Sequence, residues 1–216
     1  MSLIQLGKAC GTDKYEHGFL PLYDSLFESF KNSDIFFLEI GVFFGSSIKM
    51  WSTYFPNGII YGIDSFAGKQ GNGNYFENAD KFYNEWLQYK SNIELFKVDQ
   101  SVEGEVILFT QMCKEKNIKF KVILDDGSHL MYDQQLTFNY LFELLDDDGF
   151  YIIEDTHTCD QAGYDVMPNK LNSTKNCFKT NTFTSVYNFS QSNHINFKSA
   201  INYEIKPHSQ TMVIRP

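Results

Sequence analysis

The chain is poor in cysteine, and its cysteines form no short paired motif. Four are present among 216 residues, and none belongs to a Cys-x-x-Cys pair. They are Cys10, Cys113, Cys159 and Cys177. This scarcity argues against a zinc cluster or a disulfide framework, and it favours a reducing, cytoplasmic environment.

Basic residues and long apolar runs are also lacking. The 18 Lys and Arg residues are scattered and are outnumbered by 27 Asp and Glu, so the formal net charge is −9. Proteins that bind nucleic acid need clustered basic side chains, so no nucleic-acid partner is expected. No run of 18 apolar residues occurs, and the first residues lack the pattern of a secretory signal. We therefore expect no membrane segment either.

Aromatic residues, by contrast, are abundant. They make up 17% of the chain, with 21 Phe and 13 Tyr, and hydrophobic residues reach 43%. Disordered chains contain too few aromatic and hydrophobic residues to form a core of this kind. The length suits one domain, so we predict a single domain over residues 1–216.

Short apolar runs alternate with helical segments between residues 35 and 155. The runs cover 35–40, 58–63, 93–98, 120–124 and 149–153, and helical spacing is found over 48–51, 79–90, 103–116 and 131–145. This alternation is typical of a parallel sheet with helices on both faces. We predict an α/β fold built on a Rossmann-like, doubly wound and mostly parallel sheet. The order of its strands is left open.

The segments on either side of this core have a different character. Residues 1–34 are predicted as a cap of helix and loop, in which the polar, glycine-bounded stretch 11–18 is a loop. Residues 156–182 are polar and form a predicted acceptor loop. In the C-terminal region, 183–216, two strand-like stretches surround a short polar connection, which predicts an antiparallel hairpin that closes one sheet edge.

A glycine-rich turn follows the first predicted strand. Gly41 and Gly45 allow the backbone to approach a ligand closely at the start of a helix. Phe43 stands where a dinucleotide-binding turn has its second glycine, and Glu39 adds an acid, so the pattern argues against NAD. A purely structural turn is the alternative interpretation.

Acidic residues end the second and third predicted strands as well. Asp64 lies about 20 residues after the turn, where a carboxylate can accept hydrogen bonds from both hydroxyls of a ribose. A solvated strand-end acid is the alternative. Asp99 and Gln100 could meet the edge of an adenine, although a helix cap by Asp99 or Ser101 explains the same residues.

Four further acids, Asp125, Asp126, Glu154 and Asp155, end the fourth and fifth predicted strands. Asp126, Glu154 and Asp155 would repel one another unless a cation lay between them, and their oxygen ligands favour a hard ion such as Mg²⁺. His129, three residues beyond Asp126, could act as a general base. The alternative is a helix cap beside a surface histidine. Asp125 is interpreted as such a cap or as a minor cofactor contact.

Four motifs then stand in order along residues 6–158. They are Gly11-Thr12-Asp13-Lys14 with His17 and Tyr23, Glu39-Ile40-Gly41-Val42-Phe43-Phe44-Gly45-Ser46-Ser47, Asp125-Asp126-Gly127-Ser128-His129, and Ile153-Glu154-Asp155. Together they resemble the class I S-adenosylmethionine-dependent methyltransferases. More narrowly, they resemble the metal-dependent sugar O-methyltransferases of the macrocin and mycinamicin type.

The resemblance implies a donor site and a metal site. The donor, S-adenosylmethionine, would be held by Thr12, Lys14, Glu39, Gly41, Gly45, Ser46, Asp64, Asp99, Gln100 and Asp125. Within this set, the glycine turn would hold the methionine part, and Lys14 is placed near the methionine carboxylate. Mg²⁺ would be bound by Asp126, Glu154 and Asp155, with His129 as the base.

The implied reaction is methylation of a sugar hydroxyl. A vicinal diol is the favoured acceptor, because its two hydroxyls could chelate the ion. Residues 156–182 would form a wall of the acceptor site. Catechol is an alternative acceptor, and homo-oligomerisation is left open. One rival function is a metal-dependent hydroxylase of the cephalosporin-hydroxylase-like type, in which Asp126, His129 and His157 would imitate a two-His, one-carboxylate iron site. The other is a binding module that holds the cofactor without catalysis.

Overall fold

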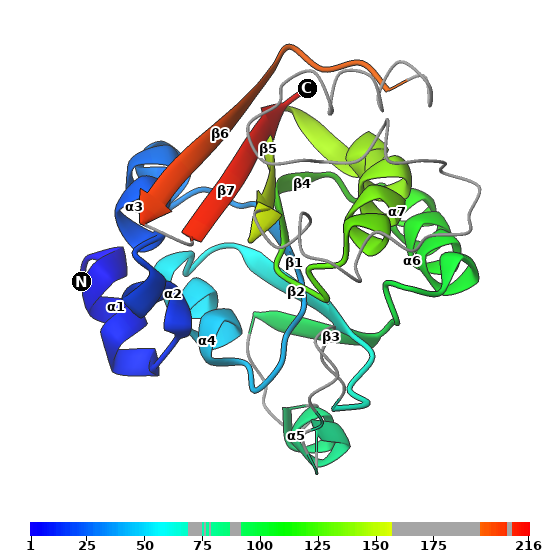
Figure 1. Cartoon of the computed structure of the whole chain (residues 1–216), viewed down its shortest axis with the longest axis horizontal. Helices are drawn as coiled ribbons and strands as arrows, with labels where there is room; N and C mark the ends of the chain where they lie inside the picture. The colour runs from blue at the N-terminus through cyan, green and yellow to red at the C-terminus, as the bar shows by residue number, and fades with distance from the viewer. Residues whose placement is uncertain (69–74, 76, 78, 87–91, 157–194, 207–208) are drawn as a thin grey trace.

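The computed structural model describes residues 1–68, 75, 77, 79–86, 92–156, 195–206 and 209–216 (Figure 1). In this part of the chain, seven strands form one sheet in the order β3-β2-β1-β4-β5-β7-β6. The parallel strands are β1 (Phe36–Ile40), β2 (Ile59–Asp64), β3 (Ile93–Lys97), β4 (Phe120–Asp125) and β5 (Leu145–Glu154). The predicted α/β, doubly wound fold is confirmed.

The C-terminal hairpin is also confirmed, and the structure gives its place. Strand β7 (Ser209–Arg215) pairs antiparallel with β5, and β6 (Ser199–Lys206) pairs antiparallel with β7 at the edge of the sheet. The first hairpin strand was predicted over residues 195–205, and in the structure it begins at Ser199. Most of the predicted acceptor loop lies outside the described residues.

Helices cover both faces of the sheet (Figure 1). One face carries α1 (Leu3–Cys10), α3 (Leu20–Phe27), the short 3₁₀ turn η1 (Glu28–Phe30) and α4 (Ser46–Tyr54). The other carries α6 (Glu103–Glu115), α7 (Met131–Leu141) and η2 (Phe142–Leu144). Helix α5 (Ala79–Trp86) follows β2. No helix among the described residues is long and apolar enough to cross a membrane.

The prediction of a loop over residues 11–18 is wrong. Residues Asp13–His17 form the helix α2, which Gly11 and Gly18 flank in left-handed conformations with φ of 68° and 83°. Glycine readily adopts this conformation, which ends helices. The two glycines therefore mark helix ends rather than the limits of a loop.

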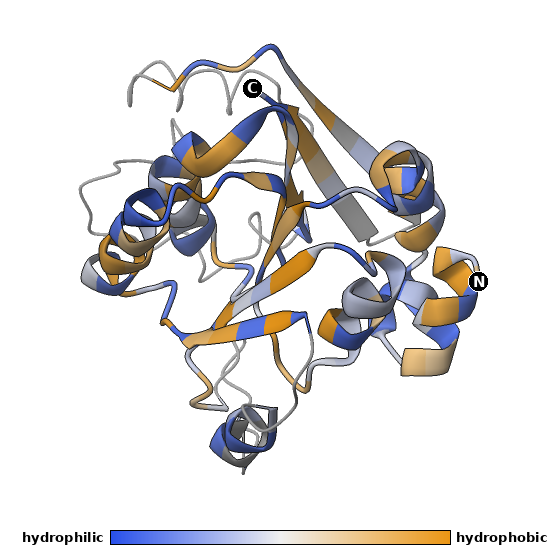
Figure 2. Ribbon diagram, turned by 180° about the vertical axis from the view of Figure 1, so that it is seen from behind, coloured by the Kyte–Doolittle hydropathy of each residue, from blue (hydrophilic) through white to orange (hydrophobic). Residues whose placement is uncertain are grey.

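Buried aromatic side chains account for much of the packing under α1, α3 and α4. Phe27, Phe37 and Trp51 are fully buried, and the ring centroids of Phe37 and Trp51 lie 4.9 Å apart. Figure 2 shows hydrophobic residues concentrated on the strands, while the helices carry both hydrophobic and hydrophilic residues. The high aromatic content of the sequence thus serves mainly the core.

Strand alternation decides which way the strand-end acids face. On β1, Leu38 and Ile40 pack toward α6 and α7, so Glu39 between them faces the N-terminal helices. On β5, Ile153 likewise packs toward α6 and α7, so Glu154 faces the N-terminal helices. Asp125 follows Leu124, which packs on the N-terminal side, so its side chain faces α7.

Candidate functional site

A cavity of about 670 Å³ lies at the carboxyl ends of the parallel strands. It is centred where the strand order reverses between β1 and β4, the usual ligand position in open α/β sheets. Predicted site residues that line it are Thr12, Gly41, Ser46, Asp64, Asp99, Gln100, Asp126 and His129. Lys14, Glu39, Gly45, Asp125, Glu154 and Asp155 are not part of this lining.

The turn after β1 requires glycine at position 41. Gly41 has a φ of 91°, and a Cβ atom there would lie 2.2 Å from the backbone oxygen of Asp126. The loops after β1 and β4 therefore approach each other more closely than any side chain would allow. This contact brings the glycine turn beside the acids that follow β4.

Asp64 fixes the same turn. Its Oδ2 accepts hydrogen bonds from the backbone N–H groups of Val42 and Phe43 at 2.9 and 3.0 Å, and its Oδ1 accepts one from Phe66 N–H at 2.7 Å. Phe43 has a positive φ of 49°, which is costly for a bulky residue. The carboxylate thus shapes the turn while it also lines the cavity.

The residues after β3 combine a local turn with one unsatisfied amide. Asp99 Oδ1 accepts hydrogen bonds from Ser101 N–H and Oγ–H at 2.9 and 2.6 Å. This is a local turn and not the helix cap that the sequence left as an alternative, because the N-cap of α6 is Val102, which has no side-chain cap. Gln100 Oε1 accepts a hydrogen bond from Ser128 N–H at 2.7 Å. Its Nε2 is buried without a hydrogen bond in the described part of the chain. Gln100 is at the same time one of the residues that line the cavity.

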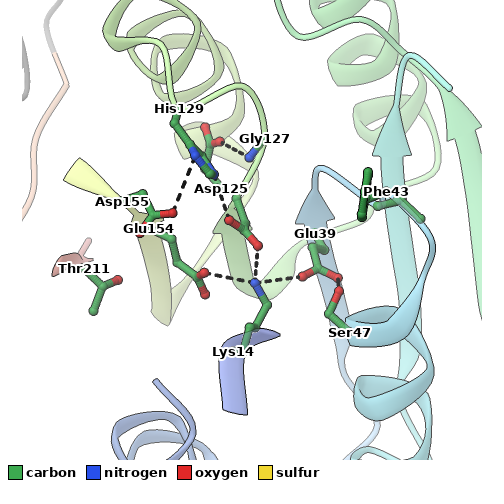
Figure 3. A network of polar contacts seen from close by, with 12 residues as sticks. Lys14, Glu39, Phe43, Ser47, Asp125, Gly127, His129, Glu154, Asp155 and Thr211 are labelled. Atoms are coloured by element: carbon green, nitrogen blue, oxygen red, sulfur yellow. Dashed lines mark hydrogen bonds and ion pairs between the residues drawn. The ribbon is translucent and has the colours of Figure 1, made fainter. Parts of the chain in front are cut away.

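A buried lysine lies at the centre of the acids (Figure 3). Lys14 Nζ donates to Asp126 Oδ2 in a very short contact and to Glu154 Oε2 at 3.0 Å. It also lies 3.5 Å from Glu39 Oε1. Three strand ends therefore share one ammonium group, which the sequence had placed at the methionine carboxylate instead.

Two further side chains hold Glu39 and Glu154. Ser47 at the start of α4 donates to Glu39 Oε2 at 2.8 Å. Tyr23 on α3 donates to Glu154 Oε1 at 2.7 Å, and its hydroxyl lies 3.4 Å from Thr211 Oγ1 on β7. The sequence assigned no role to Tyr23 or Thr211. Tyr23 stands in the first motif, but its contact with Glu154 was not predicted; the alternation of β5, which turns Glu154 toward α3, is the signal that could have shown it.

The lysine decides the protonation of Asp126. Burial alone would raise the pKa of the Asp126 carboxyl, but the Lys14 ammonium and the His129 ring outweigh burial and hold that pKa well below its ordinary value. Burial raises the pKa of Glu39 to about 7, against the opposing effect of Lys14. Burial and the charge of Asp126 likewise raise the pKa of Glu154.

His129 lies between two carboxylates. Its Nε2 is 3.0 Å from Asp126 Oδ1, and its Nδ1 is 3.5 Å from Asp155 Oδ2. Burial would lower the pKa of His129, but the hydrogen bond to Asp126 and the two negative charges raise it overall. His129 and Asp155 both adopt positive φ values, of 59° and 51°, and such strain is often found at functional sites.

Asp126, His129 and Asp155 could together hold a metal ion. One ligand atom from each lies within 4.8 Å of the others. Oxygen and imidazole ligands of this kind suit hard or borderline divalent ions, and both Asp126 and His129 face the cavity. The carboxylates of Asp126 and Asp155 offer the oxygen ligands that Mg²⁺ prefers, and Glu154, next to Asp155 in sequence, is engaged by Lys14 and Tyr23.

Asp125 is separate from this group. Its side chain is fully buried toward α7, where Thr137 Oγ donates to Oδ2 in a very short contact and Gly127 N–H donates to Oδ1 at 3.4 Å. Burial raises its pKa to about 7. Asp125 does not cap α7, whose N-cap is Leu130 without a side-chain cap, and it does not line the cavity.

Comparison with known proteins identifies relatives in sequence. The chain is 32% identical over 155 residues to 8-demethyl-8-(2-methoxy-alpha-L-rhamnosyl)-tetracenomycin-C 3'-O-methyltransferase of Streptomyces olivaceus. The aligned region covers 68% of this chain and 34% of that protein. The chain is 29% identical over 155 residues to L-olivosyl-oleandolide 3-O-methyltransferase of Streptomyces antibioticus, covering 68% of this chain and 35% of that protein. No family model matches the chain.

Solved structures share the fold. The MycE methyltransferase of the mycinamycin biosynthetic pathway, in complex with Mg, SAH and mycinamycin VI, superposes with a TM-score of 0.69 at 22% identity over 100% of this chain and 54% of that one. Human methyltransferase-like protein 13, in complex with SAH, gives 0.58 at 12% identity over 93% of this chain and 81% of that one. The chain spans about a third of the length of the curated relatives it matches.

Proposed function

Because the chain has the class I methyltransferase fold and is a sequence relative of the macrocin- and mycinamicin-type sugar O-methyltransferases, we propose that it transfers a methyl group from S-adenosylmethionine to a hydroxyl of a sugar or glycoside, with Mg²⁺ as the metal. The observation that carries this proposal is the position of Asp126 and His129. Both line the cavity and contact each other at 3.0 Å, and Asp126 lies close enough to Asp155 for the two carboxylates to share a metal ion.

The donor would occupy the cavity beside the turn after β1. Asp64 lines the cavity at the end of β2 and would accept hydrogen bonds from the ribose hydroxyls. Gln100 would offer its unsatisfied Nε2–H to the adenine. Thr12, Gly41, Ser46 and Asp99 complete the proposed set of donor contacts.

The remaining predicted donor contacts have a supporting role in this proposal. Glu39 is bonded to Ser47 and Lys14, and Asp125 is bonded to Thr137. Gly45, with a φ of 73°, forms the start of α4. None of these residues lines the cavity, so we propose that they stabilise the loops around it without contacting the donor.

Mg²⁺, held by Asp126 and Asp155 with Glu154 close by, would lower the pKa of an acceptor hydroxyl, much as metal coordination lowers that of water. His129 would accept the proton of that hydroxyl, since its ring faces the cavity beside Asp126. The acceptor oxygen would then bond to the methyl carbon, and the carbon–sulfur bond would break to release S-adenosylhomocysteine. The protein mainly supplies alignment of the two reactants.

The acceptor is proposed to carry a vicinal diol, because two neighbouring hydroxyls can chelate one ion. The predicted acceptor wall lies mostly in residues 157–182, outside the described residues. His157, which the rival hydroxylase would need as its second imidazole, also lies outside them. The cytoplasmic location and the lack of nucleic-acid or membrane partners stay predictions.

The test is methyl transfer by the purified chain. S-adenosylmethionine is supplied with a panel of nucleotide-linked sugars, glycosides and catechol, each compared with its deoxy analogue that lacks one hydroxyl. Products are measured by mass spectrometry with Mg²⁺ and with a chelator. We expect transfer to a vicinal-diol sugar that the chelator abolishes. Transfer that the chelator leaves intact would contradict the metal proposal. Donor binding by calorimetry without transfer to any acceptor would instead indicate a binding module.

A further inference from the structure

Lys14 is a lysine whose charged side chain is completely buried. It lies at the centre of the strand ends rather than in the cavity lining. The short helix α2 carries it between the left-handed glycines 11 and 18. Its ammonium group reaches carboxylates from β1, from β5 and from the loop directly after β4. A buried ammonium of this kind is retained only where it is paired.

The ammonium contacts two of the carboxylates that were predicted to bind the metal. Lys14 Nζ donates to Asp126 Oδ2 and to Glu154 Oε2, whereas Asp126 Oδ1 faces His129. Two cations that share one carboxylate repel each other, and in a buried site the repulsion is weakly screened. The Lys14 ammonium and a divalent ion would therefore compete for these carboxylates.

A third carboxylate gives the ammonium an alternative partner. Glu39 Oε1 lies 3.5 Å from Lys14 Nζ and, in the described part of the chain, is buried without a hydrogen bond. Of the three carboxylates around the ammonium, only Asp126 belongs to the group that could hold the ion. Glu154 adjoins Asp155 in sequence, whereas Glu39 comes from β1. A small shift of the flexible lysine side chain toward Glu39 would leave Asp126 and Glu154 more available.

We propose that Lys14 is a positioning residue that competes with the divalent ion for Asp126 and Glu154, and that Glu39 holds the ammonium when the ion binds. The inference rests on the proposed function, because it takes Mg²⁺ as the ion. Lys14 stabilises the acids without the ion and limits the affinity of the site for it. A purely structural lysine would have only the first effect.

The experiment titrates Mg²⁺ alone into the full chain by calorimetry, without donor or acceptor. Lys14→Met is expected to bind Mg²⁺ about tenfold more tightly than the wild type, because a neighbouring positive charge is gone. Glu39→Gln is expected to bind it several-fold more weakly, because the ammonium loses its alternative partner. Lys114→Met is the matched control, since Lys114 forms a surface ion pair with Glu143, and its Mg²⁺ affinity should equal the wild type.

Thermal unfolding supplies a second measurement on the same proteins. Without Mg²⁺, Lys14→Met should have a lower Tm than the wild type, and saturating Mg²⁺ should raise its Tm by more than it raises that of the wild type. If Lys14→Met does not fold, Lys14→Gln replaces it and should also bind Mg²⁺ more tightly than the wild type. Glu39→Gln, which should bind Mg²⁺ more weakly, then remains the second measurement.

The outcomes separate this inference from the proposed function. Unchanged or weaker Mg²⁺ binding by a folded neutral Lys14 variant, or unchanged binding by Glu39→Gln, overturns the competition while the metal site stands. Failure of the wild type and of every variant to bind Mg²⁺ overturns both the metal site and the competition. Tighter binding by the Lys14 variant together with weaker binding by Glu39→Gln supports the competition, whether or not an acceptor has been found.

Discussion

The two sides of the site are held together in different ways. Around the turn after β1, polar groups bond over shorter stretches of chain: Asp64 to Val42 and Phe43, which are 22 and 21 residues away, and Asp99 to Ser101, two residues away. Around the acids, Lys14 bonds to Asp126 and Glu154, which are 112 and 140 residues away. The polar contacts of Asp64 join the ends of two consecutive strands, whereas those of Lys14 join segments more than 100 residues apart.

This difference leads to separable effects. Changes on the acid side should affect the metal and the chemical step, and changes at the turn should affect the donor. A variant that affects both sides equally would show that the two act as one unit.

The largest effect is expected from Asp126→Ala. The substitution removes a proposed metal ligand and the partner of both Lys14 and His129. We expect methyl transfer to fall below detection, while the affinity for S-adenosylhomocysteine stays within about tenfold, or roughly 1.4 kcal/mol. Transfer assays and calorimetry give the two values. Asp148→Ala, at an exposed ion pair with Lys121, is the matched control.

Asp126→Ala also breaks a buried ion pair, so its circular dichroism and Tm must show a folded protein before the assay is interpreted. Methylation at the rate of the wild type would remove Asp126 from the metal site.

The next largest effect is expected from His129→Asn. Asparagine tolerates the positive φ of 59° at this position better than most residues, so the loop should keep its shape. We expect the transfer rate to fall by about 10²–10⁴-fold, as for loss of a general base. Mg²⁺ affinity, measured by calorimetry, should change little. A parallel loss of Mg²⁺ affinity would assign His129 as a metal ligand instead of the base.

The contrast also explains what could be predicted from the sequence. The apolar runs and helical spacing predicted the fold class, because local burial patterns determine strands and helices. The acids at the ends of β1, β2, β4 and β5 could be assigned to one edge of the sheet for the same reason. The strand order, which follows from pairing between distant segments, could not be predicted.

The partner of the acids was missed for a related reason. The sequence predicted a metal ion between Asp126 and Glu154, whereas the structure places the Lys14 ammonium between them. Lys14 lies more than 100 residues before both acids, on a helix that was predicted as a loop. Strand alternation could have shown that Glu39 and Glu154 face the same helices and that Asp125 faces the opposite way. That step requires knowing which face each layer of helices covers.

A smaller effect, confined to the donor, is expected from Asp64→Ala. The carboxylate accepts hydrogen bonds from the turn at Val42 and Phe43 and is the proposed ribose contact. Loss of charge-assisted hydrogen bonds should weaken S-adenosylhomocysteine binding by about 10–100-fold. Mg²⁺ affinity measured without donor should be unchanged. Equal weakening of Mg²⁺ binding would mean that the turn and the acids are not separable.

The smallest effect concerns stability and comes from Asp125→Asn. Burial raises the pKa of Asp125 to about 7 in the folded protein, above the ordinary value of 3.8. The folded state therefore holds this proton more tightly than the unfolded state does. The protonated Asp125 carboxyl makes its full contribution to the free energy of unfolding below about pH 4, and this contribution is lost as the pH rises toward 7. Asparagine stays neutral, so between pH 5 and pH 8 the variant should lose less stability than the wild type, by about 1–2 kcal/mol.

Urea unfolding at pH 5 and pH 8 measures this difference. The wild type and the variant should both keep the contribution of Glu39, whose pKa burial raises in the same direction to about 7, so the pH dependence of the variant should be reduced rather than absent. Asp148→Asn, at an exposed position, should behave as the wild type. An identical pH dependence in Asp125→Asn and the wild type would show that Asp125 ionises in the fold as readily as in water. Its contact with Thr137 would then have to offset the whole cost of burial.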